Sequence, residues 1–167
     1  MFEKLDSIED APFDLLLLAD PSMKLILEYL QSGECFIYKD GSVILGCYVL
    51  KEINIDKVEL VNIAVSENKQ SHGIGKKLLL HLFDYAKQKG YKEIIVGTGN
   101  SSIDQIAFYQ KAGFRMIGVE IGFFERNYND KIYENGILCR DKIWFLKKCE
   151  QVIYGCYIKI IKIKNKR

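Results

Sequence analysis

The sequence predicts an α/β fold in one domain, on three observations. Val58–Val65 is a near-continuous apolar run, as expected for a strand that is buried on both faces. A glycine pair and then an amphipathic helix follow this run, with apolar residues at helical spacing: Leu79, Leu82, Phe83 and Ala86. The 167 residues suit one domain with its own core.

Two helices are expected ahead of this strand. Asp10-Ala11-Pro12 and Asp20-Pro21-Ser22 each pair a capping residue with an early proline, which is typical of helix starts. The first helix would carry Leu15–Leu18, and the second would end at Gly33. Phe2–Leu5 is a poor candidate for a strand before them.

A hairpin is expected next, followed by a connector. Glu34–Lys39 and Ser42–Leu50 are joined by Asp-Gly, the turn that matches the twist of two paired strands. The polar stretch Lys51–Asp56 would connect the hairpin to the apolar strand.

The rest of the chain is expected to alternate strands and helices. Gly90 would end the helix that follows the glycine pair, since glycine is common just past a helix. The later predictions are a strand at Glu93–Gly97, a turn at Thr98–Asn100, a capping box at Ser102–Gln105 that opens a helix, a strand at Phe114–Ile121, a loop at Phe123–Asn135 and a last strand at Ile137–Leu146.

The glycine pair indicates an anion site. The first turn of a helix has N–H groups without internal partners, and the helix dipole adds positive charge there. Gly73 and Gly75 carry no side chains, so a ligand can approach the backbone closely. Lys76 and Lys77 oppose the dipole, so two cations together make more sense if an anion binds between them. A phosphate group fits such a site best. The alternative is that the glycines only shape the turn.

Two common phosphate motifs do not fit this stretch. The P-loop needs glycine at the position of Gln70 and serine or threonine at that of Lys77. The dinucleotide fingerprint needs glycine at the position of Leu78. A third pattern, Gln/Arg-x-x-Gly-x-Gly/Ala between a strand and a helix, matches Gln70–Gly75.

On this motif the sequence resembles the GNAT superfamily of N-acetyltransferases, with most similarity to bacterial, bacillus-type members. A second family motif, Tyr-x-Lys-x-Gly-Phe, is matched by Tyr109–Phe114. The resemblance implies a mixed, mostly antiparallel sheet that is splayed between two parallel central strands and flanked by helices. It also implies a GNAT domain over residues 1–148, followed by a strand-prone basic extension over residues 149–167.

The resemblance further implies that acetyl-CoA is the co-substrate and that no metal is needed. The loop at the glycine pair would hold its pyrophosphate, and the central strand would contact its acetyl and pantetheine arm. Asn100 would supply a coenzyme contact where many members have asparagine at the position of Ser102, or it simply shapes a turn. The expected coenzyme-binding residues are Ile63, Ala64, Val65, Gln70, Ser71, His72, Gly73, Ile74, Gly75, Lys76, Asn100 and Tyr109.

Two residues are candidates for proton transfer. Tyr109 is the candidate general acid, because a phenol with a pKa near 10 can protonate a leaving thiolate; the alternative is an aromatic that packs in the core. Glu59 is the candidate base, because it interrupts an apolar run and a buried carboxylate is costly unless it is paired or used. The alternative places Glu59 at the exposed start of the strand.

Composition narrows the functional class. Five widely spaced cysteines without a CxxC pair favour reduced thiols in the cytoplasm over disulfides or a zinc site. No signal peptide and no membrane-spanning run are recognisable. The net charge of +2 misleads, because five cations fall in the last nine residues and residues 1–158 carry −3. Nucleic-acid binding therefore has no support in the body of the protein.

The sequence thus predicts a cytoplasmic enzyme that transfers acetyl from acetyl-CoA to a primary amine of a small molecule or protein, by direct attack. One alternative is a catalytically silent module that binds acyl-CoA. Another is an adaptor that uses the basic C-terminal extension, which could also add an edge strand or mediate a homodimer contact.

Overall fold

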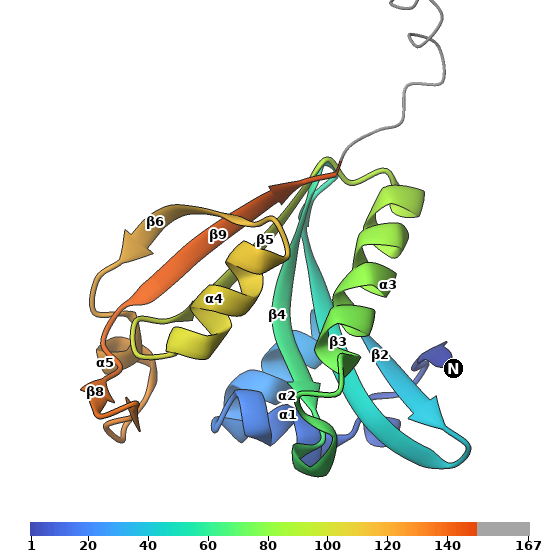
Figure 1. Cartoon of the computed structure of the whole chain (residues 1–167), viewed down its shortest axis with the longest axis horizontal. Helices are drawn as coiled ribbons and strands as arrows, with labels where there is room; N and C mark the ends of the chain where they lie inside the picture. Colours follow the sequence, from blue (N-terminus) through green and yellow to red (C-terminus); the bar gives the residue numbers. More distant parts are fainter. Residues whose placement is uncertain (150–167) are drawn as a thin grey trace, which may run out of the picture.

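The computed structural model describes residues 1–149 and contains a seven-stranded sheet flanked by helices (Figure 1). All neighbouring strands are antiparallel except the central pair β4 and β5, which is parallel. This arrangement confirms the predicted fold. In sheet order the strands are β1 (Phe2–Lys4), β2 (Gly33–Asp40), β3 (Val43–Asn54), β4 (Lys57–Val65), β5 (Glu93–Gly99), β9 (Lys142–Lys148) and β6 (Arg115–Glu120).

The sheet has a hydrophobic core on each face. One core joins the sheet to α3 (Ile74–Lys89) and α4 (Ile103–Lys111), and it includes Leu78 and Leu82 of α3. The other joins β2, β3 and β4 to α1 (Phe13–Ala19) and α2 (Met23–Ser32). The remaining elements are α5 (Phe123–Asn127), the two-stranded pair β7 (Tyr133–Glu134) and β8 (Ile137–Leu138), and the 3-10 turns Ile8–Asp10 and Glu67–Lys69.

Two predictions before the central strand were wrong. Lys51–Asp56 is not a connector, because β3 continues to Asn54 and pairs with the start of β4. Phe2–Leu5 does contain a strand, since β1 pairs with β2 through Phe2, Glu3 and Lys4. Both segments are mostly exposed to solvent, so their strands can contain polar residues. A search for apolar runs does not find such strands.

Four predictions after α3 were also wrong. Thr98 and Gly99 belong to strand β5 and not to a turn. The capping box at the start of α4 does not form, because the Ser102 side chain caps no helix N–H and donates instead to Glu134. The loop at 123–135 holds α5 and β7, and the last strand is divided into β8 and β9.

The predicted extension lies outside the described residues, apart from Cys149. Within residues 1–149 no helix has both the length and the apolar character needed to cross a membrane. In the same range no three histidine, cysteine, aspartate or glutamate residues are grouped so that they could hold a metal ion.

Candidate active site

The two parallel strands at the centre of the sheet are paired over only part of their length. Lys57–Leu60 of β4 pairs with Glu93–Val96 of β5, and the pairing stops there. Beyond this point the strands diverge (Figure 1). The N–H and C=O groups that β4 directs toward β5 over Val61–Val65 therefore have no ladder partners in that strand, and buried backbone groups require partners from elsewhere.

A β-bulge in β4 coincides with this split. Leu60 and Asn62 pair with consecutive residues of β3, so Val61 is the extra residue. A bulge bends its strand and disrupts the ladder locally. The side-chain alternation changes phase there, because Leu60 packs toward α3 whereas Asn62 and Ala64 pack toward α1 and α2.

The three residues predicted along the coenzyme arm lie directly after the bulge. Ile63 and Val65 pack against the core beneath α3, and Ala64 packs on the opposite face. Their side chains therefore do not form one surface. What they share is the backbone edge that faces the split, and this edge is the feature that a thioester could contact.

The loop before α3 exposes its backbone as predicted for an anion site. The residues from Gln70 to Gly73 are exposed, and the Gln70 side chain donates to the Val65 carbonyl, which fixes the loop to the end of β4. Ser71 and Gly73 have φ angles of 61° and 77°. Nδ1 of the His72 ring turns back to the Gln70 carbonyl, and Ile74 is buried, so Ile74 could offer a ligand only its N–H group.

The two glycines of this loop have different functions. A Cβ at Gly73 would meet nothing within 4 Å, so this glycine serves the left-handed turn and the open approach to the backbone. A Cβ at Gly75 would lie 3.2 Å from Cζ of Phe108 on α4. Gly75 therefore makes room for the packing of α3 against α4, which its place in the motif did not indicate.

Tyr109 lies in the core between α4 and the sheet. It is only 4% exposed, and its ring contacts Phe114 and Phe145. Its hydroxyl makes no hydrogen bond with any residue of the described range 1–149. Burial raises the pKa of Tyr109 above its ordinary value, which favours the protonated phenol that a general acid requires.

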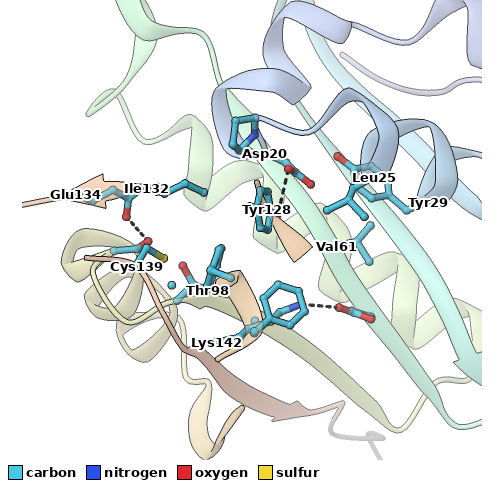
Figure 2. Close-up of a pocket in the computed structure, with 18 of the residues that line it drawn as sticks. Asp20, Leu25, Tyr29, Val61, Thr98, Tyr128, Ile132, Glu134, Cys139 and Lys142 are labelled. Carbon is cyan, nitrogen blue, oxygen red and sulfur yellow. Dashed lines mark hydrogen bonds and ion pairs between the residues drawn. The ribbon is translucent and has the colours of Figure 1, made fainter. Parts of the chain in front are cut away.

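A cavity of about 320 Å³ lies on the α1 and α2 side of the split (Figure 2). Val61 and Thr98 line it from the diverging strands, and aromatic residues line it from α5 and the residues after it. Its charged side chains come from six separate elements or junctions: Asp20, Glu28, Lys51, Glu59, Glu134 and Lys142.

Glu59 lies in this cavity, paired with a lysine that the sequence did not single out. Its carboxylate is 3.6 Å from the Lys142 ammonium, and the two side chains are only 15% and 16% exposed. The Lys142 ammonium also lies over the rings of Phe123 and Trp144, at 4.6 and 4.0 Å. Burial lowers the pKa of Lys142, and the negative charge of Glu59 opposes that shift.

Gly97 provides the space for this lysine. A Cβ built at Gly97 would lie 2.0 Å from Cε of Lys142, and one at Gly99 would lie 2.5 Å from Sγ of Cys139. Both glycines face the same side of β5, because side chains alternate along a strand. Glycine is needed at both positions because side chains from other segments, Lys142 and Cys139, occupy the space that a Cβ would take.

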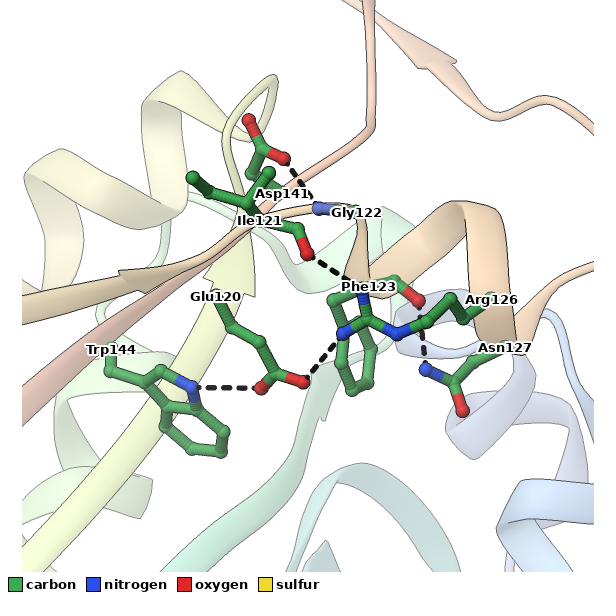
Figure 3. A network of polar contacts seen from close by, with 8 residues as sticks. All are labelled: Glu120, Ile121, Gly122, Phe123, Arg126, Asn127, Asp141 and Trp144. Carbon is green, nitrogen blue, oxygen red and sulfur yellow. Dashed lines mark hydrogen bonds and ion pairs between the residues drawn. The ribbon is translucent and has the colours of Figure 1, made fainter.

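A polar network fixes α5 at the edge of the cavity (Figure 3). Asp141 accepts a hydrogen bond from the Gly122 N–H at 2.8 Å. Arg126 donates to the Ile121 carbonyl at 2.6 Å and to Glu120 at 3.0 Å, and Trp144 donates to the other oxygen of Glu120 at 3.2 Å. These bonds hold Phe123 where its ring covers Lys142.

Asn100 forms a tie between segments. Its Nδ2 donates to the Leu138 carbonyl at 3.1 Å, and its Oδ1 accepts from the N–H groups of Arg140 and Asp141 at 2.8 and 2.9 Å. These bonds agree with the alternative that Asn100 shapes a turn. They hold the segment after β8 against the start of α4.

Comparison with known proteins identifies the family. The model of the acetyltransferase (GNAT) family matches residues 3–114. The uncharacterized N-acetyltransferase YvbK of Bacillus subtilis is 47% identical over 138 residues, which cover 83% of this chain and 89% of YvbK. The family match and the identity to YvbK both exceed chance similarity. The split between the parallel strands is consistent with the same family. The chain belongs to the GNAT family of acetyltransferases.

Solved structures agree with this assignment. A GNAT family acetyltransferase from Elizabethkingia anophelis, with acetyl-CoA bound, superposes with a TM-score of 0.86 at 44% identity, and covers 89% of this chain and 97% of its own. A Bacillus subtilis acetyltransferase in complex with CoA gives a TM-score of 0.83 at 45% identity, with 88% and 97% covered.

Several residues of the cavity were not predicted as site residues. Asp20 was noted only as a helix start, and Tyr128 and Lys142 were not noted. Asn62 carried a signal that was missed: like Glu59, it interrupts the apolar run of β4. Its Nδ2 donates to the Leu16 carbonyl and to the Tyr29 hydroxyl, while its buried Oδ1 has no partner in residues 1–149.

Proposed function

We propose that this protein transfers the acetyl group of acetyl-CoA to the primary amine of a small, cationic acceptor. The observation that carries the proposal is the split between β4 and β5, with an exposed loop suited to anions after the end of β4 and a partly open, carboxylate-lined cavity on the α1 and α2 side. The acetyl-CoA and CoA bound to the two structural relatives support the choice of donor.

The coenzyme would occupy the side of the split next to α3 and α4. Backbone N–H groups from Ser71 to Lys76 suit a pyrophosphate, because α3 is 16 residues long and directs its positive dipole end there. The free backbone edge at Ile63–Val65 suits the arm and the thioester oxygen. Donors already fixed toward a developing oxyanion usually supply the largest catalytic contribution.

Tyr109 is the proposed general acid for the departing sulfur. As the amine nitrogen bonds to the carbonyl carbon, the C–S bond breaks and the thiolate takes a proton from the phenol. No covalent enzyme intermediate is needed, because the amine attacks directly. A carboxylate in the cavity would accept the proton that the amine loses; the sequence singles out Glu59 for this role, and the cavity also contains Asp20.

The acceptor is proposed to be small because the cavity, which is partly open, has a volume of only about 320 Å³. Four carboxylates and two ammonium groups line it, which favours cationic molecules. Aromatic side chains on one wall favour an acceptor with an apolar body.

Thiol release from acetyl-CoA tests this proposal against benzylamine, phenethylamine and 1,5-diaminopentane. We expect amine-dependent release, with kcat lowered roughly 10²- to 10⁴-fold in Tyr109→Phe at unchanged coenzyme affinity. Stability should not fall, since the hydroxyl has no hydrogen bond to lose within residues 1–149. Tight CoA binding without turnover on any amine would favour the silent binding module instead.

A further inference from the structure

The junction between α1 and α2 places a carboxylate at the cavity wall. Oδ1 of Asp20 accepts hydrogen bonds from the Ser22 N–H at 2.9 Å and from the Tyr128 hydroxyl at 3.1 Å. Within residues 1–149 its second oxygen, Oδ2, accepts none. One oxygen is therefore held from two sides, and the other is available to a molecule in the cavity (Figure 2).

Asp20 differs from Glu59 in its electrostatic partners. Glu59 is paired with Lys142, whereas no cationic group in residues 1–149 lies within 4.0 Å of Asp20. An ion pair would hold Glu59 in place and neutralise it. Asp20 instead presents a partly buried negative charge without a matching cation, and such a charge is costly unless something binds it.

Burial raises the pKa of Asp20, while the bonds from Ser22 and Tyr128 and the charge of Lys142 lower it. A carboxylate with a raised pKa is a better proton acceptor than an ordinary one. The titratable and charged groups that face Asp20 or share its cavity are Tyr29 and Glu28 from α2, Lys51 from β3, Glu59 from β4, Tyr128 after α5, Glu134 from β7, Cys139 after β8 and Lys142 from β9.

We propose that Asp20 binds the ammonium group of the acceptor and takes its proton as the amine attacks, an inference that rests on the proposed acetyl transfer. Oδ2 receives the proton, and Tyr128 and Ser22 hold Oδ1. The Glu59–Lys142 pair then forms the floor of the cavity and positions the acceptor without exchanging protons with it.

The proton balance is complete with the groups named. An ammonium ion gives one proton to Asp20, and the resulting amine forms the C–N bond with the carbonyl carbon. The nitrogen loses a second proton as the C–S bond breaks, and this proton replaces the one that Tyr109 gives to the sulfur. Asp20 finally releases its proton to solvent, and the products are an amide and free CoA.

The proposed role sets the acceptor class. The side chain at Oδ1, Tyr128, stacks on Phe124 with ring centroids 5.3 Å apart, so an aromatic surface borders the carboxylate. A small amine with an apolar body would place its ammonium at Asp20 and its body against these rings. A neutral alcohol of the same shape would lack the charge that Asp20 requires.

Binding tests the first half of the inference without turnover. Calorimetric titration of the CoA-saturated protein should show phenethylamine binding at least tenfold more tightly than phenethyl alcohol. Asp20→Asn keeps the shape and the Oδ1 acceptor, and should remove this preference while CoA affinity stays unchanged. Equal affinities for amine and alcohol in the unmodified protein, or a preference that survives in Asp20→Asn, would overturn the inference.

The pH profile of kcat/KM tests the second half with the fastest amine of the panel. Activity should fall on the acidic side as Asp20 is protonated, and Asp20→Asn should lower kcat roughly 10²- to 10⁴-fold and abolish that limb. Tyr128→Phe removes a bond that favours the carboxylate, so it should shift the acidic limb to higher pH. This variant retains Asp20 and serves even if Asp20→Asn does not fold.

Glu59→Gln is the matched comparison, and it should keep the acidic limb where it is. Loss of the limb in Glu59→Gln, with the limb intact in Asp20→Asn, would assign the base to Glu59 and overturn the inference. If no amine is acetylated while the amine preference in binding holds, the proposed function fails and the recognition by Asp20 stands.

Discussion

The proposed coenzyme loop and the proposed acceptor cavity lie on either side of one split, yet they are built in opposite ways. The loop is a single continuous segment, Gln70–Lys76, and it uses backbone groups that the start of any helix provides. The cavity uses side chains from α1, α2, β3, β4, β5, β7, β9 and the region of α5. The loop depends on local conformation, whereas the cavity depends on the packing of distant segments.

The contrast indicates where specificity lies. A short motif suffices for a ligand that backbone groups hold, because the start of any helix provides such groups. The proposed acceptor would instead be recognised by particular side chains, such as Asp20 and Lys142, which are far apart in the sequence. The following changes test whether the two regions behave independently.

Gly97→Ala should produce the largest effect, and it should act on the acceptor side alone. The new methyl group would occupy the space of the Lys142 chain and force the ammonium away from Glu59 into the cavity. We expect kcat/KM for the acceptor to fall roughly 100-fold, the cost of a small misplacement in a catalytic site. Steady-state kinetics at saturating acetyl-CoA would measure it.

Lys142→Ala, which removes the charge and every side-chain atom beyond Cβ, provides the comparison for Gly97→Ala. In the double variant the truncated side chain leaves room for the methyl group at position 97, so the effect of Gly97→Ala should shrink. An unchanged acceptor KM and kcat in Gly97→Ala would contradict the structural role given to this glycine.

Local patterns predicted much of the fold. Two helix starts, one Asp-Gly turn and one apolar run with the following helix agreed with α1, α2, the β2–β3 hairpin and the β4–α3 unit. Several of the failures share a cause, since the deciding partner is distant in sequence. Ser102 looks like the start of a capping box, but its hydroxyl donates to Glu134, 32 residues away.

The candidate site also has a part that the sequence predicts and a part that depends on residues distant in the sequence. The loop could be predicted because its residues are consecutive. Glu59 was a sequence candidate because it interrupts an apolar run, but its pairing with Lys142 crosses 83 residues. Asp20 and Tyr128 are 108 residues apart, and neither carries a local pattern that indicates their hydrogen bond.

Gly73→Ala should affect the coenzyme side, with a smaller effect. At φ 77° alanine is strained by about 1–2 kcal/mol, which should lower the free energy of unfolding by that amount. Distortion of the loop should also weaken CoA binding by roughly tenfold, a change of about 1.4 kcal/mol. Thermal unfolding and calorimetry would measure the two effects.

Gly90→Ala is a closely matched control for Gly73→Ala. Gly90 ends the same helix at φ 87°, and a Cβ there would also meet nothing within 4 Å. The loss of stability should be similar, while CoA affinity should be unchanged. Equal losses of CoA affinity in both variants would mean that the loop acts only through helix stability.

Asn100→Ala should produce the smallest effect on function, because the residue ties segments together. Removing its three hydrogen bonds should lower the free energy of unfolding by about 1–3 kcal/mol, with CoA affinity changed less than twofold. Asn127→Ala, which removes one exposed bond to the Phe123 carbonyl, should cost at most about 0.5 kcal/mol. A tenfold loss of CoA affinity in Asn100→Ala would instead support the predicted coenzyme contact. Asn100 would then serve the coenzyme side as well as the packing of distant segments, and the two regions would not be independent.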